Sequence, residues 1–180
     1  GYEVIIVVAT IPALNEQGPE QRRRRHLSAA SSLQSRCQAA SIFCPLESGC
    51  DDAAVTSPFD MERLHPTLNV IRPHWGVDYQ ANQDDLVLAA ADGQIELADY
   101  ISGYGNTVVL RHADGSATLY AHLSSIKVAT GDFVSRGNPM GNVGQTGLAT
   151  GTHLHLEYAP NGAVFNNAFR IDPHPCTIVV

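Results

Sequence analysis

The 180-residue sequence has no run of about 18 apolar residues, the length that a membrane-spanning helix requires. Its longest apolar segment, residues 4–14, is shorter, is interrupted by Pro12 and lacks the charged start of a signal peptide. We expect a buried strand there, with a trimmed remnant of a membrane anchor as the alternative. Positive charge is also scarce: the net charge is -7, which argues against a nucleic-acid binder. The basic block at residues 22–25 is expected to be a solvated stretch.

The sequence also lacks a CxxC pair, and this argues against a zinc knuckle built from cysteines. There are four cysteines, Cys37, Cys44, Cys50 and Cys176. An even number with three close together suggests two disulfides and an oxidising compartment. We favour one bridge within the cluster and one from the cluster to Cys176. Four cysteines allow three pairings, so the connectivity stays open, and free buried thiols are the alternative.

The pattern of apolar, polar and glycine residues changes near residue 54. Residues 1–54 are expected to form an N-terminal extension with an apolar strand, a polar linker, a short helix over residues 27–43 and the cysteine cluster. Residues 55–180 are expected to form one domain of short alternating strands separated by glycine turns. The expected strands cover residues 86–90, 94–100, 107–112, 117–123, 132–137, 140–144 and 153–159.

The turn dipeptide Asp-Gly occurs twice between strand-like runs, at residues 92–93 and 114–115, and predicts a hairpin at each place. The predicted fold class is therefore mostly β, an antiparallel β-sheet with a small helical N-terminal extension. Neither an internal repeat nor a low-complexity tract is present.

Two histidines separated by one residue stand out in the segment 150-TGTHLHLEYAP-160. In a strand, residues two apart point to the same face, so His153 and His155 would point one way and Leu154 and Leu156 the other. Such a strand aims two imidazole rings at one place.

Other residues of the chain have the chemistry to meet this pair. His74 and Asp78 are four residues apart, and His122 ends a strand-like run. A catalytic zinc ion takes three protein ligands and keeps one position open, and two histidines with one carboxylate are sufficient. The remaining imidazoles would act as acid or base. Each signal alone is weak, because a single histidine or HxH pair is more often structural.

The combination of these motifs, in this order and among these glycines, resembles the lysostaphin/LytM-type zinc endopeptidases, which cleave peptide bonds in bacterial cell walls. The resemblance runs from about Val55 to about Pro175. The matching segments are 57-SPFDMERLHP-66, 74-HWGVDY-79, 103-GYGNTVVLRHADG-115, 120-YAHLS-124 and 131-GDFVSRGNPMGNVGQTGLATGTHLHLEY-158. It implies the duplicated-hybrid-motif type of antiparallel β-sheet, one Zn²⁺ ion and a peptidoglycan peptide as substrate.

The resemblance also implies roles for five residues. His74 and Asp78 match the family's HxxxD motif and would be the first two zinc ligands. His155, the second histidine of HxH, would be the third. His153, the first histidine of that pair, and His122 match the two catalytic histidines. All five positions agree with the family pattern.

Four further residues have expected roles around these five. Tyr104 and Tyr120 are candidates for lining a substrate groove. Glu157 lies two residues beyond His155 on the same strand face, and it is a candidate for supporting that ligand from behind. His112, at the end of a strand-like run, is expected to have a surface or turn role.

The function we expect is zinc-dependent hydrolysis of peptide bonds in peptidoglycan, outside the cytoplasm. The first alternative is a non-catalytic wall-binding or amidase-activating module of the same fold. A cupin barrel also uses HxH but places its glutamate and its other ligand further along the chain, and a secretion component would share the chemistry. Residues 1–54 are a candidate for self-inhibition, with Asn15 or Glu16 reaching the metal. Which peptidoglycan bond is cut stays open.

Overall fold

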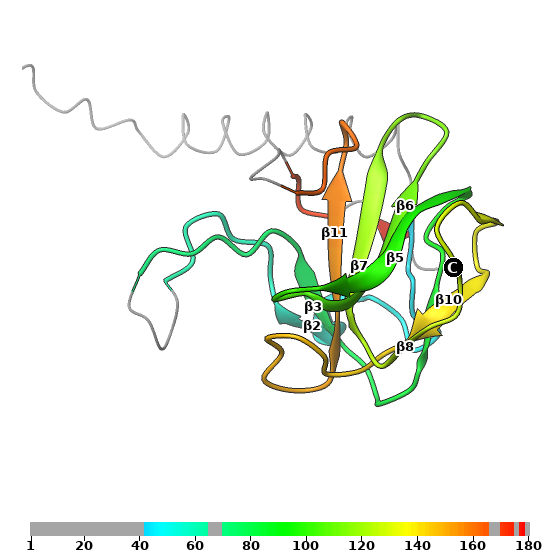
Figure 1. Ribbon diagram of the computed structural model, residues 1–180. Helices are drawn as coiled ribbons and strands as arrows, with labels where there is room; N and C mark the ends of the chain where they lie inside the picture. The colour runs from blue at the N-terminus through cyan, green and yellow to red at the C-terminus, as the bar shows by residue number, and fades with distance from the viewer. Residues whose placement is uncertain (1–41, 65–69, 166–169, 175–176, 179–180) are drawn as a thin grey trace, which may run out of the picture.

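A computed structural model of the protein describes residues 42–64, 70–165, 170–174 and 177–178. These residues form an almost entirely β structure, as predicted (Figure 1). Its strands are β1 (Ile42–Phe43), β2 (Val55–Ser57), β3 (Val77–Gln80), β4 (Leu86–Leu88), β5 (Gly93–Ile101), β6 (Gly105–Arg111), β7 (Ala117–Leu123), β8 (Ser125–Ile126), β9 (Phe133–Val134), β10 (Pro139–Asn142), β11 (His153–Ala159) and β12 (Thr177–Ile178), and a 3-10 helix spans Asp52–Ala54. Among the described residues, no helix has the length and apolar character needed to cross a membrane.

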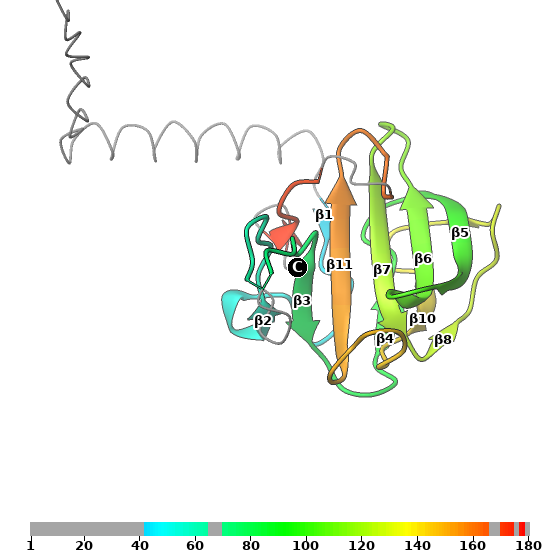
Figure 2. The same cartoon turned by 60° about the vertical axis from the view of Figure 1, so that its left-hand side comes forward.

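The strands form one large sheet and two small ones. The large sheet has seven strands in the order β2-β3-β11-β7-β6-β5-β9, and its neighbours pair antiparallel. Figure 2 shows β3, β11, β7, β6 and β5 side by side across this sheet. A second sheet has the order β4-β10-β8, and β1 pairs with β12 in parallel. In the large sheet, β3 and β11 are direct neighbours although they are more than 70 residues apart in the sequence.

The main core lies between the large sheet and the β4-β10-β8 sheet. It joins residues of the small sheet, Val87 and Met140, to residues of the large one, such as Val77 and Leu154. A second, smaller cluster, which includes Leu119 and Ala121, covers the other face of the large sheet. Strand β11 shows the alternation directly, because its even-numbered residues 154, 156 and 158 join the main core while Ala159 joins the second cluster. The prediction that this strand presents its two faces differently is confirmed.

One of the two predicted hairpins is present. Residues 114–115 lie in the turn between β6 and β7, which pair with each other. The hairpin predicted at residues 92–93 is wrong, because β4 pairs with β10 while β5 pairs with β6 and β9. The chain crosses there from one sheet to the other. A local turn signal reports a change of direction, and the partner that the next strand finds depends on the whole fold.

The described part of the predicted N-terminal extension belongs to the body of the fold. Ile42, Leu46 and Cys50 are buried in the same main core as the strands of the large sheet. The boundary expected at residue 54 therefore coincides with no break in the packing. The helix predicted over residues 27–43 lies almost wholly outside the described residues, as does the rest of the extension.

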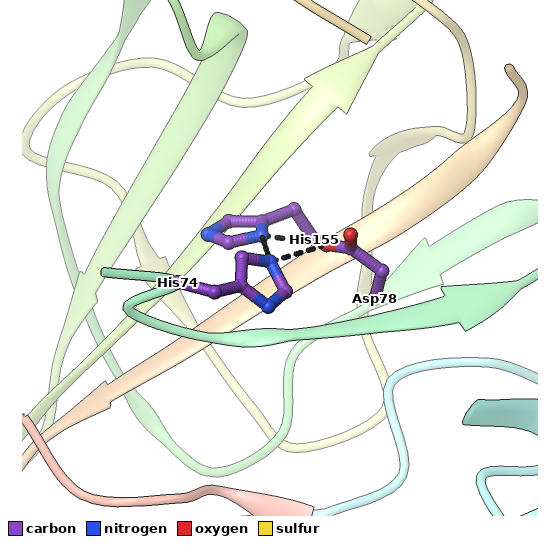
Figure 3. A group of neighbouring side chains, drawn as sticks. All are labelled: His74, Asp78 and His155. Carbon is purple, nitrogen blue, oxygen red and sulfur yellow. Dashed lines mark hydrogen bonds and ion pairs between the residues drawn. The ribbon is translucent and has the colours of Figure 1, made fainter. Parts of the chain in front are cut away.

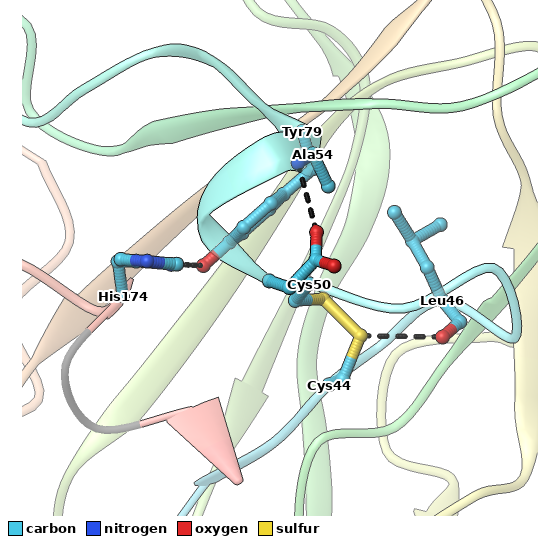
Figure 4. The surroundings of a disulfide bond; sticks show 7 residues. Cys44, Leu46, Cys50, Ala54, Tyr79 and His174 are labelled. Atoms are coloured by element: carbon cyan, nitrogen blue, oxygen red, sulfur yellow. Dashed lines mark hydrogen bonds between the residues drawn. A yellow bond between two sulfur atoms is a disulfide. The ribbon is translucent and has the colours of Figure 1, made fainter. Parts of the chain in front are cut away.

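A disulfide joins Cys44 and Cys50, which is the bridge expected within the cysteine cluster (Figure 4). Cys37 and Cys176 lie outside the described residues. Beside this disulfide, His174 contacts two parts of the chain: its Nδ1 lies 2.9 Å from the Tyr79 hydroxyl and its Nε2 lies 2.7 Å from Asp52.

His112 begins the turn between β6 and β7, where its carbonyl accepts from the Gly115 backbone, so the turn role is confirmed; its ring is buried and does not lie on the surface. Burial lowers the pKa of His112, and its two nitrogens lie 3.0 Å from the Asp92 carbonyl and 3.0 Å from the Thr118 hydroxyl. The Thr118 hydroxyl in turn lies 2.8 Å from that of Tyr120. A buried polar side chain needs such partners, and here they form a chain of hydrogen bonds within the core.

Candidate metal and catalytic site

Three predicted metal ligands, two of them near β3 and one on the distant strand β11, meet at one point (Figure 3). Asp78 lies on β3 directly opposite His155 on β11, and His74 lies just before β3. Asp78 Oδ1 is 2.7 Å from His155 Nδ1 and 3.1 Å from His74 Nε2, and the two ring nitrogens are 3.3 Å apart. The antiparallel pairing of β3 with β11 is what brings the carboxylate and the ring together.

Hydrogen bonds behind the two rings fix which nitrogen faces this point. His74 Nδ1 lies 2.7 Å from the Pro58 carbonyl oxygen, which can only accept, so Nδ1 carries the hydrogen. His155 Nε2 lies 3.2 Å from the Glu157 carboxylate and donates to it. The other nitrogen of each ring therefore faces Asp78, and it is the nitrogen that would bind a metal in place of a proton. A metal-ligating histidine is oriented in this way, by a hydrogen bond from its other nitrogen.

The ligand set fits a zinc ion. In a tetrahedral site with zinc–nitrogen bonds of 2.0–2.1 Å, neighbouring ligand atoms lie about 3.3 Å apart. The three ligand-atom separations here, 2.7, 3.1 and 3.3 Å, are close to that value. Two imidazoles and one carboxylate are also a donor set that catalytic zinc takes, with the fourth position left for water or substrate.

The electrostatics of the three side chains favour a cation between them. Burial alone would raise the pKa of Asp78, but hydrogen bonds and charge interactions with His155 and His74 outweigh it and hold that pKa well below its usual range. Burial alone would lower the pKa of His155, but Asp78 and Glu157 outweigh it and raise the pKa to about 9. The site thus attracts positive charge strongly.

The two predicted catalytic histidines lie next to the predicted ligands. The His122 ring centroid is 4.8 Å from that of His153 and 5.7 Å from that of His155. His122 Nδ1 lies 2.8 Å from the Thr146 carbonyl, and His153 Nδ1 lies 2.9 Å from the Gly151 carbonyl. Since a carbonyl only accepts, each ring donates through Nδ1 and presents Nε2 as a proton acceptor. His153 Nε2 is 3.6 Å from Asp78 Oδ1.

A bulge in β7 turns His122 toward this site. Leu119 and Ala121 face the second cluster and Tyr120 faces the main core, so strict alternation would point His122 into the main core. Instead, the pairing of β6 with β7 shifts register here, and His122 has a φ of 62°. Leu123 then takes the place in the main core. Bulges commonly re-aim a side chain next to an active site in this way.

Burial, followed by the neighbouring positive charge of His155, lowers the pKa of His122 to about 4. The ring is therefore neutral near pH 7. A neutral imidazole with an exposed lone pair is suited to accepting a proton.

The three further residues with expected roles around this site have different surroundings. The Glu157 carboxylate lies against His155 Nε2, the position from which it was expected to support that ligand. Tyr104 is half-buried, its ring is 5.9 Å from that of His155, and its hydroxyl donates to Glu157 at 2.7 Å. Tyr120 does not line a groove: it is fully buried in the main core, on the other face of β7, and its hydroxyl accepts from the Ala90 backbone. The LYAHL pattern around it did not reveal which face it takes.

Several contributors to the site were not predicted. Arg170 donates to Glu157 Oε2 at 2.7 Å, and the backbone carbonyls of Pro58, Thr146 and Gly151 orient three histidines. Backbone carbonyls carry no sequence signal. Arg170 had no signal either: a buried carboxylate requires a cationic partner, but the sequence did not show that Glu157 is buried.

The sequence of this chain matches a known protein family. Residues 72–167, more than half of the chain, match the model of Peptidase family M23. The chain therefore belongs to Peptidase family M23, and the resemblance found in the sequence is confirmed.

Two curated relatives and two solved structures show the extent of the similarity. The DD-carboxypeptidase/endopeptidase Mpg of Neisseria meningitidis is 48% identical over 121 residues, which are 67% of this chain and 28% of that protein. The Peptidoglycan DD-endopeptidase ShyC of Vibrio cholerae is 41% identical over 117 residues, which are 65% of this chain and 27% of that protein. The chain thus spans little more than a quarter of the length of these relatives.

The solved structures share the fold. A zinc-containing peptidase from Vibrio cholerae is 32% identical with a TM-score of 0.60, covering 68% of this chain and 38% of that one. The catalytic domain of the antimicrobial peptidase lysostaphin from Staphylococcus simulans is 33% identical with a TM-score of 0.58, covering 66% of this chain and 87% of that one. The lysostaphin-like antiparallel fold predicted from the sequence is confirmed.

Proposed function

We propose that this chain is a zinc-dependent endopeptidase that hydrolyses peptide bonds of bacterial peptidoglycan outside the cytoplasm. The observation that carries the proposal is the convergence of His74, Asp78 and His155 with two further histidines at their side. The names of the relatives support the substrate class, because one acts as a DD-carboxypeptidase/endopeptidase and another as a peptidoglycan DD-endopeptidase.

His74, Asp78 and His155 would hold the metal. When bound, zinc supplies Lewis acidity, which acidifies a water molecule and polarises the carbonyl of the bond to be cut. The protein's own part is to place proton acceptors beside that position. His122 and His153 each offer Nε2, because Nδ1 of each ring is held by a backbone carbonyl. One of these two histidines accepts the proton of the attacking water.

The test separates metal binding from turnover. The whole chain is loaded with zinc and incubated with purified sacculi, and the released fragments are identified by mass spectrometry, which also reveals the bond that is cut. Asp78→Ala should lose zinc and hydrolysis together. His122→Ala and His153→Ala should keep most of the zinc and lose turnover. A wild-type chain that binds zinc one-to-one and sacculi tightly yet releases no fragment would favour the non-catalytic module and refute the proposal.

Self-inhibition by the N-terminal extension stays a prediction, and the structure sharpens its test. A truncation after residue 54 would remove Ile42, Leu46 and Cys50 from the main core and so destabilise the domain itself. Deletion of residues 1–41 avoids this loss. If these residues cover the site, the truncated chain should hydrolyse sacculi faster than the whole chain; equal or slower hydrolysis would contradict the prediction.

A further inference from the structure

The buried carboxylate of Glu157 is held by three donors. Oε1 accepts from the Tyr104 hydroxyl at 2.7 Å and from His155 Nε2 at 3.2 Å, and Oε2 accepts from Arg170 Nε at 2.7 Å. Glu157 is wholly buried, and the Arg170 side chain is only 3% exposed. With Tyr104 on one oxygen and Arg170 on the other, the carboxylate is fixed in the rotation that turns Oε1 toward His155.

Arg170 reaches Glu157 from a separate part of the chain. It begins the described segment 170–174, which follows β11 after an excursion of about ten residues. Two further contacts hold this segment: the Arg170 guanidinium donates to the Ala163 carbonyl at 2.6 Å, and the Ile171 backbone bonds to Tyr158 on β11. The segment is thus tied along the same strand that carries His155.

The position of Glu157 matters because it decides which nitrogen of His155 is available. A carboxylate that only accepts keeps a hydrogen of His155 on Nε2, so that Nδ1, which faces Asp78, is the nitrogen left to bind a metal. A negative charge behind the ring also makes Nδ1 a better ligand. If the carboxylate could rotate away, it would neither hold the hydrogen on Nε2 nor strengthen Nδ1 as a ligand.

We propose that Arg170 is a positioning residue of the metal site, which acts through Glu157 to orient the ligand His155, and that Tyr104 serves the same carboxylate rather than the substrate. The proposal rests on the proposed zinc site. It makes the segment that follows the family's HxH strand a part of the metal centre.

The test measures zinc affinity by competition with a chelator, alongside kcat and KM on a soluble peptidoglycan peptide. Arg170→Met should weaken zinc binding by about 10–100-fold, the usual effect of losing a group that orients a ligand. Arg170→Lys, which keeps the charge, should bind zinc more tightly than Arg170→Met. The matched control is Arg111→Met, which removes an arginine–glutamate pair with Glu96 elsewhere in the sheet and should leave zinc affinity unchanged. Raising the zinc concentration should restore much of the turnover of Arg170→Met, which a general loss of folding would not allow.

A folded Arg170→Met variant with wild-type zinc affinity would overturn the proposal. If that variant does not fold, the double variant Glu157→Gln with Arg170→Met decides instead, because it leaves neither charge buried without its partner. Weakened zinc binding in the double variant supports the proposal, and wild-type affinity overturns it. The wild-type chain separates this result from failure of the proposed function: if it binds zinc and cuts sacculi while the variants bind zinc equally well, only the role of Arg170 is wrong.

Discussion

A single added methyl group at Gly147 should lower turnover strongly without removing the metal. Gly147 has a φ of 75°, and a Cβ atom there would lie 2.4 Å from the Gly105 nitrogen and 2.6 Å from the Gly103 carbonyl oxygen. These are backbone atoms of the β5–β6 turn, which offers no flexible side chain to move aside. Gly147→Ala therefore forces the two backbones apart.

The cost can be estimated from the geometry. Placing alanine in the left-handed region costs about 1–2 kcal/mol, and overpacking costs about 1–3 kcal/mol, for a total of about 2–5 kcal/mol. Domains of this kind have about 5–15 kcal/mol of stability in all, so the protein should stay folded and relieve the strain by moving the loop. That loop carries Thr146, whose carbonyl holds His122 Nδ1 at 2.8 Å and whose backbone N–H bonds to the His122 carbonyl.

A shift of His122 by about 1 Å should lower turnover about 100-fold. Zinc should be retained, because His74, Asp78 and His155 are placed by β3 and β11 rather than by this loop. The control is Gly137→Ala, where the backbone is also left-handed, with a φ of 80°, but an added Cβ meets nothing within 4 Å. Metal content by elemental analysis, turnover on sacculi and a thermal melt would be measured for both variants. Normal turnover in Gly147→Ala, or loss of zinc together with turnover, would refute the reasoning.

Two further predictions concern stability. Replacing Cys44 and Cys50 together by serine should lower the free energy of unfolding by about 2 kcal/mol, the entropy of closing so short a loop, and an unchanged denaturation midpoint would contradict it. Because burial holds the native pKa of His112 below its unfolded value of about 6.5, the unfolded chain binds the extra proton. The contribution of neutral His112 to the free energy of unfolding is therefore intact above about pH 6.5 and is lost as the pH falls through its native pKa. The free energy of unfolding, measured by denaturation across this pH range, should fall less steeply with decreasing pH in His112→Gln than in the wild type. Identical pH dependences would rule out His112 as a cause.

Much of the fold was predictable because its strands carry their own local signals. The runs around β5 and β11 alternate apolar and polar residues, those around β6 and β7 are short and mainly apolar, and the structure places strands there within a residue or two. The error at residues 92–93 has a physical origin: a turn signal is local, whereas β5 finds its partner through pairing and core packing across the whole sheet.

The candidate ligands were predictable for a related reason. HxH on a strand aims two rings to one face, and the structure shows His155 facing Asp78 across the β3–β11 pairing. The orientation of His122 was not predictable from period-two alternation, which would have pointed it into the core. A bulge and a left-handed backbone reverse it, and both depend on contacts with the segments around Tyr104 and Thr146.

By itself, the sequence determined the β class, the chemistry of the ligand set and the strand that carries two histidines, because residue type and spacing along one strand act over short range. Only the tertiary structure decided that Tyr120 is buried, that His122 turns toward the site and that Arg170 stands behind Glu157. These three outcomes depend on which strands pair and in what register. Register is settled by the packing of the whole core, so no local stretch of sequence contains it.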